Sequence, residues 1–275
     1  ETIAAVTGTN GKTSVAYFTR ALWQAMGLPA ASIGTLGVMM PEAIMPLGYT
    51  TPDPVLLHKT LTYLVGHGIQ HAVIEASSHG LDQYRLDGAR IKSAAFTNLT
   101  RDHLDYHASS EDYLSAKLGL ISRVLDKTGT AVLNADSEVY PAFLRAAKDR
   151  GVKIISYGRM ADELKLISLA PESAGQVITV EIFGNREEIM LPLAGEFQVM
   201  NALCALGLVI GAGACGCCAA LSAHENGAEV LILERDATPT GSTSLSGGQI
   251  PAAGTKLQAK AGVDDSVQLL EKDIL

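Results

Sequence analysis

The sequence predicts an α/β protein: a mostly parallel sheet flanked by helices, with a small antiparallel sheet, followed by an incomplete βαβ fragment. Three observations favour this fold class. Short apolar runs alternate with helical patterns from Thr2 to about Tyr157, which is typical of a parallel sheet covered by helices. After Gly158 the pattern changes to strands separated by glycine-bearing turns. From about residue 207 the glycine spacing changes again and becomes typical of dinucleotide binding.

The first strand and the first helix enclose a glycine-bearing loop, residues 7–13 (T-G-T-N-G-K-T). Residues 3–6 are small and apolar, which suits a buried strand, and residues 14–26 have helical spacing. In such a loop the backbone N–H groups and the helix dipole face phosphates, the lysine reaches the terminal phosphates, and the hydroxyl ligates magnesium. Val6 stands where the usual pattern has a glycine. The loop predicts nucleotide binding and a P-loop-type sheet.

The remaining elements follow in chain order. Further parallel strands are expected at residues 31–36, 71–75, 93–97, 130–134 and 153–156. Asp53 with Pro54 opens a helix that Gly68 closes. Ser109, with an aspartate three residues later, begins a second helix that runs to about Lys127. Antiparallel strands are expected at residues 164–169, 176–183 and 187–191.

Composition excludes several classes of protein. Of the 275 residues, 47% are hydrophobic and 18% are charged, which provides a sizeable core and argues against global disorder. The net charge of −8 argues against a general nucleic-acid or membrane-surface binder. The chain starts at Glu1 without a signal pattern, so we interpret it as an excised piece of a longer protein.

Two apolar features in the last third of the chain favour a structural interpretation. All four cysteines lie between residues 204 and 218 without a second pair, which favours small buried side chains in a reducing compartment over a zinc site. Residues 202–223 carry no charge and are long enough to span a bilayer. This stretch contains four glycines and lacks flanking aromatic and basic residues, so we expect no membrane span.

Three further motifs place reactive groups near the phosphate loop. Residues 75–81 (E-A-S-S-H-G-L) follow a predicted strand, where ligands bind in an open parallel sheet, so Glu75 is a candidate magnesium ligand. The alternative is a strand-end glutamate that faces solvent. Residues 98–107 (N-L-T-R-D-H-L-D-Y-H) contain two histidines and two aspartates, and their composition taken alone suggests zinc. Lys117 follows Tyr113 by one helical turn, and taken alone it is a solvated surface cation.

These motifs, with Y-L-S-A-K at residues 113–117, resemble the central ATP-binding domain of the Mur ligases over roughly residues 1–209. They match the type that adds the third amino acid to UDP-N-acetylmuramoyl-L-alanyl-D-glutamate. The resemblance implies an ATP-dependent ligase of peptidoglycan precursor synthesis, cytoplasmic and monomeric, with magnesium as cofactor. Its implied partners are the UDP-muramoyl-dipeptide and an amino acid, with no nucleic acid and no membrane.

The resemblance also implies roles for individual residues. The ATP contacts would be Thr9, Asn10, Gly11, Lys12, Thr13 and Asn201. The magnesium ligands would be Thr13, Glu75, His103 and Lys117 as a carbamate. The UDP-muramoyl substrate would contact Thr50, Thr51, Ser77, Gln83 and Arg85. The catalytic set would be Lys12, Glu75, His103 and Lys117. In the implied reaction the substrate carboxylate attacks the γ-phosphate of ATP, and an amine then displaces phosphate from the acyl phosphate.

The chain departs from the Mur pattern at about residue 207. Residues 208–216 (L-V-I-G-A-G-A-C-G) combine a predicted strand with G-x-G-x-x-G, and a second predicted strand ends at Glu234. Together with residues 234–255 they resemble the FAD-binding start of the fumarate reductase and ketosteroid dehydrogenase flavoproteins. By that analogy the FAD contacts are Gly211, Gly213, Gly216, Glu234, Ser242, Thr243, Ser246 and Gly247.

Two domains are therefore expected: a Mur ligase central domain over residues 1–206 and an incomplete, Rossmann-like FAD-binding fragment over residues 207–275. The first resemblance requires a helix from about residue 199 to 210, whereas the second requires a strand at residues 208–210. Both fit only if the helix stops near Leu206 and Gly207 breaks it. Three functions stay open: a ligase with incomplete activity, an FAD-dependent oxidoreductase fragment, and a non-catalytic nucleotide-binding fusion.

Overall fold

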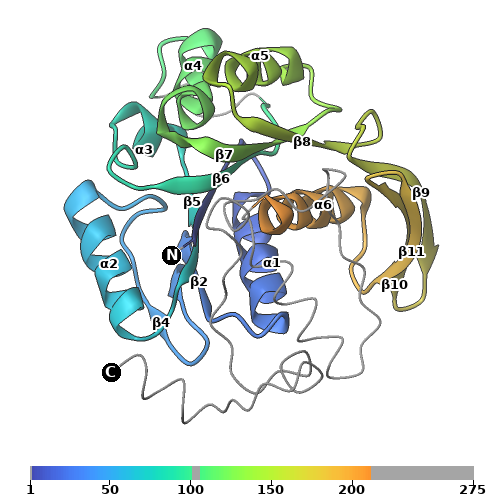
Figure 1. Ribbon diagram of the computed structural model, residues 1–275, viewed down its shortest axis with the longest axis horizontal. Helices are drawn as coiled ribbons and strands as arrows, with labels where there is room; N and C mark the ends of the chain where they lie inside the picture. Colours follow the sequence, from blue (N-terminus) through green and yellow to red (C-terminus); the bar gives the residue numbers. More distant parts are fainter. Residues whose placement is uncertain (1, 101–105, 212–275) are drawn as a thin grey trace, which may run out of the picture. The chain divides into compact units, whose positions relative to one another are not determined.

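The computed structural model describes residues 2–100 and 106–211. Within these residues, one eleven-stranded sheet has the order β11-β10-β9-β8-β7-β6-β1-β5-β2-β3-β4 (Figure 1). Its parallel centre consists of β8 (Lys153–Gly158), β7 (Leu125–Asn134), β6 (Ile91–Phe96), β1 (Thr2–Thr7), β5 (His71–Glu75) and β2 (Ala30–Gly34). These six strands confirm the predicted parallel sheet, with bounds that differ from the prediction by a few residues.

Both margins of the sheet are antiparallel. One margin consists of β3 (Gly37–Met39) and β4 (Ile44–Met45), which the sequence patterns did not reveal. The other consists of β9 (Leu164–Glu172), β10 (Gly175–Ile182) and β11 (Asn185–Leu191). The predicted antiparallel strands are thus confirmed. They extend the main sheet, because β9 pairs with β8 in parallel through Tyr157 and Leu164.

Helices cover both faces of the sheet, as Figure 1 shows. One face carries α2 (Pro54–Gly66), α3 (Ser78–Asp82), α4 (Ser110–Gly119) and α5 (Tyr140–Arg150). The other face carries α1 (Lys12–Ala25) and α6 (Glu196–Ile210). Each face has its own buried apolar cluster because side chains alternate along the strands, so Ala5 packs on one side and Val6 on the other. In the described part of the chain, no helix has the length and apolarity needed to cross a membrane.

The expected helix break at Gly207 was wrong, because α6 runs through this residue. The helix continues to Ile210, and Gly207 is buried inside it. A Cβ atom at residue 207 would lie 2.6 Å from a methyl group of Val132, so the glycine allows α6 to approach β7 closely. Residues 208–210 are therefore helical, and the strand that the flavin resemblance requires at this position is not formed. The boundary between two domains at residue 206 stays a prediction.

The helix that begins after Ser109 is shorter than predicted. The Ser109 hydroxyl accepts a hydrogen bond from the Asp112 N–H at 3.0 Å, which confirms the predicted start. The helix ends at Gly119, a single π-helical turn spans Leu120–Val124, and β7 begins at Leu125. Lys127 therefore lies in a strand, and the predicted helix end was wrong.

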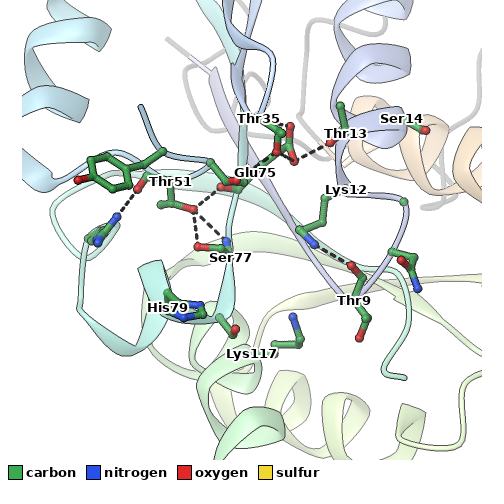
Figure 2. A pocket seen from close by; sticks show the side chains of 16 residues that line it. Thr9, Lys12, Thr13, Ser14, Thr35, Thr51, Glu75, Ser77, His79 and Lys117 are labelled. Carbon is green, nitrogen blue, oxygen red and sulfur yellow. Dashed lines mark hydrogen bonds between the residues drawn. The ribbon is translucent and has the colours of Figure 1, made fainter. Parts of the chain in front are cut away.

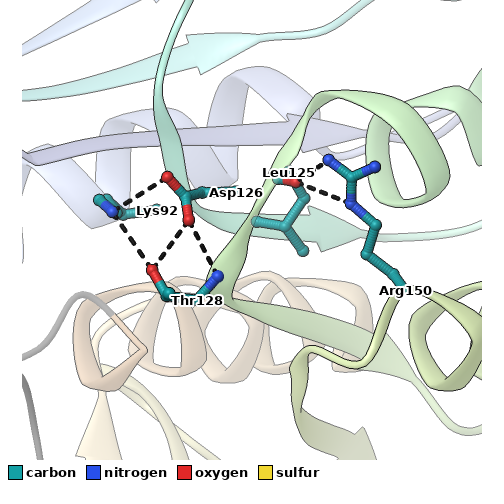
Figure 3. A network of polar contacts seen from close by, with 5 residues as sticks. All are labelled: Lys92, Leu125, Asp126, Thr128 and Arg150. Carbon is teal, nitrogen blue, oxygen red and sulfur yellow. Dashed lines mark hydrogen bonds and ion pairs between the residues drawn. The ribbon is translucent and has the colours of Figure 1, made fainter.

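A side chain from α5 explains this early end. Arg150 donates hydrogen bonds to the backbone carbonyls of Ser122 (2.8 Å), Arg123 (2.8 Å) and Leu125 (2.6 Å), so the last carbonyls of the turn are satisfied without further helix. Figure 3 shows Arg150 at Leu125, beside the polar contacts of Asp126. The backbone and hydroxyl of Thr128, with Lys92, lower the pKa of the Asp126 carboxyl to about 2. Side-chain contacts thus hold the backbone on both sides of the start of β7: those of Arg150 at Ser122–Leu125, and those of Asp126 with Lys92 and Thr128.

We expect Arg150→Lys to lower the free energy of unfolding by about 1–3 kcal/mol, because three different nitrogens of Arg150 donate to the three carbonyls and the single nitrogen of a lysine cannot reach all of them. Arg145→Lys, at an exposed position of the same helix, is the matched control and should change it by less than about 0.5 kcal/mol. Urea unfolding measures both variants. Equal stability of the two variants would show that these carbonyls do not need Arg150.

His71 is buried at the start of β5 against Trp23, the single tryptophan of the sequence. The two ring centroids lie 5.4 Å apart. Burial lowers the pKa of the imidazole below its ordinary value of 6.5, so the unfolded chain binds this proton more readily than the folded chain. The stability linked to neutral His71 is therefore complete above pH 6.5 and is lost as the pH falls below it.

We expect the free energy of unfolding to fall between pH 7.5 and 5.5 in the wild type, by at most about 1.4 kcal/mol per pH unit from this one group. Urea unfolding followed by Trp23 fluorescence measures the fall. This fall in the free energy of unfolding should be smaller in His71→Gln than in the wild type. In the control His58→Gln, which alters an exposed histidine on α2, the fall should equal that of the wild type. An equal fall in all three proteins would assign the pH dependence to other groups.

Candidate functional site

The carboxyl ends of β1, β5 and β6 meet at one edge of the sheet, where the strand order reverses beside β1. Open α/β sheets bind ligands at such a point. A cavity of about 520 Å³ opens there (Figure 2). Its lining comes from the loops after β1 and β2, from residues 49–51 before α2, from the end of β5 and the segment that follows it, and from one side chain of α4. The cavity therefore collects residues from five separate parts of the sequence.

The phosphate-type loop after β1 depends on two glycines. Gly8 and Gly11 have positive φ values of 151° and 88°. A Cβ atom at Gly8 would overlap the Thr97 hydroxyl, and one at Gly11 would overlap the side-chain oxygen of Asn201. The loop is thus packed between the end of β6 and helix α6. This packing places Asn201, one of the predicted ATP contacts, directly against the loop.

Two ammonium groups converge on the carbonyl oxygen of Gly8. Lys12 Nζ donates to this oxygen at 2.9 Å and to the Thr9 carbonyl at 2.8 Å. Lys117 Nζ, from α4, donates to the same Gly8 oxygen at 2.9 Å although its side chain is only 1% exposed. It also lies 4.4 Å from the ring centroid of Tyr113, whose hydroxyl is 3.1 Å from Thr9 Oγ1. Lys117 is therefore a buried cation of the site and not a solvated one.

Glu75 is a buried carboxylate, 2% exposed, at the end of β5. It accepts hydrogen bonds from the Thr13 hydroxyl (2.9 Å) and from the backbone N–H (3.0 Å) and hydroxyl (3.2 Å) of Thr35. These donors are neutral, and no ion pair joins Glu75 to a described cation. A buried carboxylate of this kind is costly unless a cation approaches it. The expectation of a strand-end glutamate facing solvent is thereby excluded.

The oxygens of Glu75 and Thr13 fit a magnesium ion, which prefers carboxylate, hydroxyl and phosphate oxygens. Among the described residues, no group of three or more His, Cys, Asp or Glu side chains could hold a metal by itself. Phosphate oxygens of a bound nucleotide are further ligands of the kind that magnesium takes. His103, the further predicted ligand, lies outside the described residues.

The residues expected to hold the UDP-muramoyl substrate form one wall beside Glu75. The Thr51 hydroxyl donates to the Glu75 carbonyl at 2.7 Å and accepts from the Ser77 N–H at 2.9 Å. Arg85 donates to the Thr51 carbonyl at 2.6 Å. Four of the five expected contacts line the cavity: Thr50, Thr51, Ser77 and Arg85. Gln83 does not; its side chain contacts Arg85 instead.

The sequence patterns missed five cavity residues: Ser14, Thr35, Tyr49, Ser78 and His79. Thr35 binds Glu75, Tyr49 lies beside the guanidinium of Arg85, and His79 lines the cavity from α3. A signal existed for Thr35, because it ends a predicted parallel strand at the same edge of the sheet as Glu75. Figure 2 shows Thr35 and His79 on opposite sides of Glu75.

Most of the predicted flavin contacts cannot be placed. Gly211 lies within the described residues, where it ends α6 with a φ of −67°. The others lie outside the described residues: Gly213, Gly216, Glu234, Ser242, Thr243, Ser246 and Gly247. Cys204 is buried as expected, and burial raises the pKa of its thiol to about 12.

Two family models match the chain. The Mur ligase middle domain matches residues 6–209, and the FAD binding domain matches residues 207–275. Similar proteins include UDP-N-acetylmuramoyl-L-alanyl-D-glutamate--2,6-diaminopimelate ligases. That of Bradyrhizobium diazoefficiens is 48% identical over 216 residues, which are 77% of this chain and 44% of the relative. That of Mesorhizobium japonicum is 49% identical over 212 residues, with the same coverage. The chain therefore spans less than half the length of these relatives.

Solved structures share the fold. A structure of a UDP-N-acetylmuramoyl-L-alanyl-D-glutamate--2,6-diaminopimelate ligase has a TM-score of 0.69 and 31% identity, and the match covers 83% of this chain and 44% of that one. A folylpolyglutamate synthase of Mycobacterium tuberculosis complexed with ADP has a TM-score of 0.64 at 21% identity, covering 76% of this chain and 54% of that one. The second likeness shows a common fold alone.

Proposed function

This chain belongs to the Mur ligase family, and we propose that it provides the ATP-binding domain for joining an amino acid to UDP-N-acetylmuramoyl-L-alanyl-D-glutamate. The observation that carries the proposal is the convergence of Lys12, Thr13, Glu75 and Lys117 on one cavity at the end of β1. The names of the similar ligases support 2,6-diaminopimelate as the amino acid. Because the chain spans less than half of these relatives, the complete ligation would need parts that they carry elsewhere.

The phosphates of ATP are proposed to lie on the loop formed by Thr9, Asn10, Gly11, Lys12 and Thr13. Backbone N–H groups and the positive end of the α1 dipole stabilise anions at this position. Lys12 would leave the loop carbonyls that it now binds and neutralise the terminal phosphates. Asn201, held against Gly11 and bonded to Gln198 at 3.3 Å, would meet the adenine.

A bound magnesium ion would neutralise charge on the phosphate oxygens. Thr13 and Glu75 would hold it, together with His103 and with Lys117 as a carbamate. A carbamate keeps one N–H group on the lysine nitrogen, so the hydrogen bond from Lys117 to the Gly8 carbonyl can persist after modification. The new carboxylate would replace a buried positive charge by a negative one at the metal.

The wall formed by Thr50, Thr51, Ser77 and Arg85 is proposed to hold the acceptor substrate with its carboxylate toward the γ-phosphate. One carboxylate oxygen forms a bond to the γ-phosphorus while the bond from phosphorus to ADP breaks. The amine nitrogen then attacks the acyl carbon, loses a proton and releases phosphate. Orientation of the reactants and neutralisation of charge supply most of the acceleration in such transfers.

A second candidate function, FAD binding, is supported by the match of residues 207–275 to the FAD binding domain. The flavin contacts would be Gly211 and the seven residues named above that lie beyond it. The helical conformation of Leu208–Ile210 disfavours this candidate, since its fingerprint begins with a strand there.

Calorimetric titration of the full chain separates these functions. We expect saturable heat with ATP and Mg²⁺, and further saturable heat when UDP-N-acetylmuramoyl-L-alanyl-D-glutamate is added to that complex. FAD is titrated separately. Heat with FAD but not with ATP and Mg²⁺ would contradict the ligase proposal and favour the flavin fragment, and heat with neither ligand would contradict both.

A further inference from the structure

We propose that Tyr106 is a positioning residue of the acceptor-substrate wall: its hydroxyl orients the amide of Gln83, which in turn holds the guanidinium of Arg85. The inference rests on the proposed function, in which Arg85 binds the acceptor substrate. Tyr106 is 39% exposed and does not line the cavity itself. It acts through other side chains.

The hydroxyl of Tyr106 has a defined direction. It donates its proton to Oδ2 of Asp82 at 2.9 Å, and a carboxylate oxygen can only accept. Because a phenol carries one proton, the hydroxyl oxygen must act as an acceptor toward Gln83. Gln83 Nε2 donates to it at 3.1 Å. The Asp82 carboxylate thus determines, through Tyr106, which end of the Gln83 amide faces the tyrosine hydroxyl.

The other end of the amide faces Arg85. Gln83 Oε1 accepts from Arg85 Nε at 3.1 Å and from Nη2 at 2.6 Å. A guanidinium only donates, so the reversed amide would place its NH₂ group against N–H groups of Arg85. The bond from Gln83 to Tyr106 therefore excludes the orientation that would release Arg85.

Arg85 is consequently held on two sides. Its Nη1 donates to the Thr51 carbonyl at 2.6 Å, and its guanidinium carbon lies 5.5 Å from the ring centroid of Tyr49. Three of its five N–H groups are engaged, which leaves two for an anionic group in the cavity. The ring of Tyr106 also packs on the cavity residue His79, with centroids 3.7 Å apart. One tyrosine thus supports two groups of the wall.

The first test needs no ligand. Tyr106→Phe keeps the ring and removes the hydroxyl, and ¹⁵N NMR of the full chain follows the Arg85 Nε–H and Gln83 NH₂ signals. We expect both signals to shift and their hydrogen exchange to accelerate. Tyr63→Phe is the matched control, because Tyr63 is 41% exposed and also stacks on a histidine, His67, at 4.0 Å. Unchanged Arg85 and Gln83 signals in Tyr106→Phe would overturn the inference.

The second test measures affinity for UDP-N-acetylmuramoyl-L-alanyl-D-glutamate by calorimetry. We expect Tyr106→Phe to weaken binding about fivefold to tenfold, with unchanged affinity for ATP and Mg²⁺. In the Gln83→Glu variant both side-chain oxygens can accept from Arg85, whichever way the side chain is turned. Adding Tyr106→Phe to this variant should therefore weaken substrate binding by less than about twofold. An equal additional loss in that background would contradict the orienting role and indicate a merely structural one.

The outcomes also separate this inference from the proposed function. A wild-type chain that does not bind the muramoyl substrate would contradict the proposed function, while the NMR comparison would still decide the role of Tyr106. If the wild type and Tyr106→Phe bind the muramoyl substrate with equal affinity, the proposed function stays intact and the inference is overturned.

Discussion

Lys12→Ala is expected to abolish the thermal stabilisation that ATP and Mg²⁺ give to this chain. A ligand that binds only the folded state stabilises it by about 2.7 kcal/mol at a concentration of 100 times its Kd. For a domain of this size that corresponds to a rise of roughly 5–10 °C in Tm. Removal of the ammonium that would neutralise the terminal phosphates should reduce this rise to nearly zero.

The comparison must be made within each protein, with and without ATP and Mg²⁺. Lys12 bonds the Gly8 and Thr9 carbonyls, so the variant alone is expected to have a lower Tm before any ligand is added. Lys148→Ala, at an exposed position on α5, is the control and should retain the full rise. A full rise in Lys12→Ala would place nucleotide binding somewhere other than the loop at residues 7–13.

Glu75→Gln is expected to remove the magnesium dependence of ATP binding. The amide keeps the size of the side chain and can still accept from the Thr35 N–H, but it no longer offers a negative charge to the metal. The affinity for ATP in the presence of Mg²⁺ should fall on the order of 100-fold, as when the supporting groups of a metal site are disturbed. Affinity without Mg²⁺ should stay the same or rise, since a buried negative charge near the phosphates is gone.

Calorimetric titration with and without Mg²⁺ measures this effect. Glu111→Gln, which neutralises an exposed carboxylate at the start of α4, is the control. The ligand-free Glu75→Gln variant should melt at the same or a higher temperature than the wild type, because the partners of Glu75 among the described residues are neutral donors. Unchanged magnesium dependence would remove Glu75 from the metal site.

Local patterns predicted the parallel part of the fold well. Apolar strands and capped helices are determined by nearby residues, as the Asp53 cap of α2 illustrates with bonds of 3.0 Å to two N–H groups. Helix α5 was not predicted, and no side chain caps its start. The two wrong helix ends depend on partners that are distant in the sequence. Arg150 ends the turn at Leu120–Val124, and Gly207 stays inside α6 because the helix packs closely against Val132.

The site followed from the sequence to the extent that its motifs follow parallel strands. Glu75 and the loop at residues 7–13 end neighbouring strands, so the topology brings them together. Lys117 was recognisable only through the family motif, because its burial depends on how α4 packs over the loop. The position of Gln83 behind Arg85, and with it the role inferred for Tyr106, required the folded arrangement of α3.

A crystal structure of the full chain with Mg²⁺ and a non-hydrolysable ATP analogue tests the central claim most directly. The account predicts the terminal phosphates at Lys12, with the metal about 2.0–2.1 Å from oxygens of Thr13 and Glu75. A triphosphate bound away from residues 7–13, or a metal that contacts neither of these side chains, would contradict it.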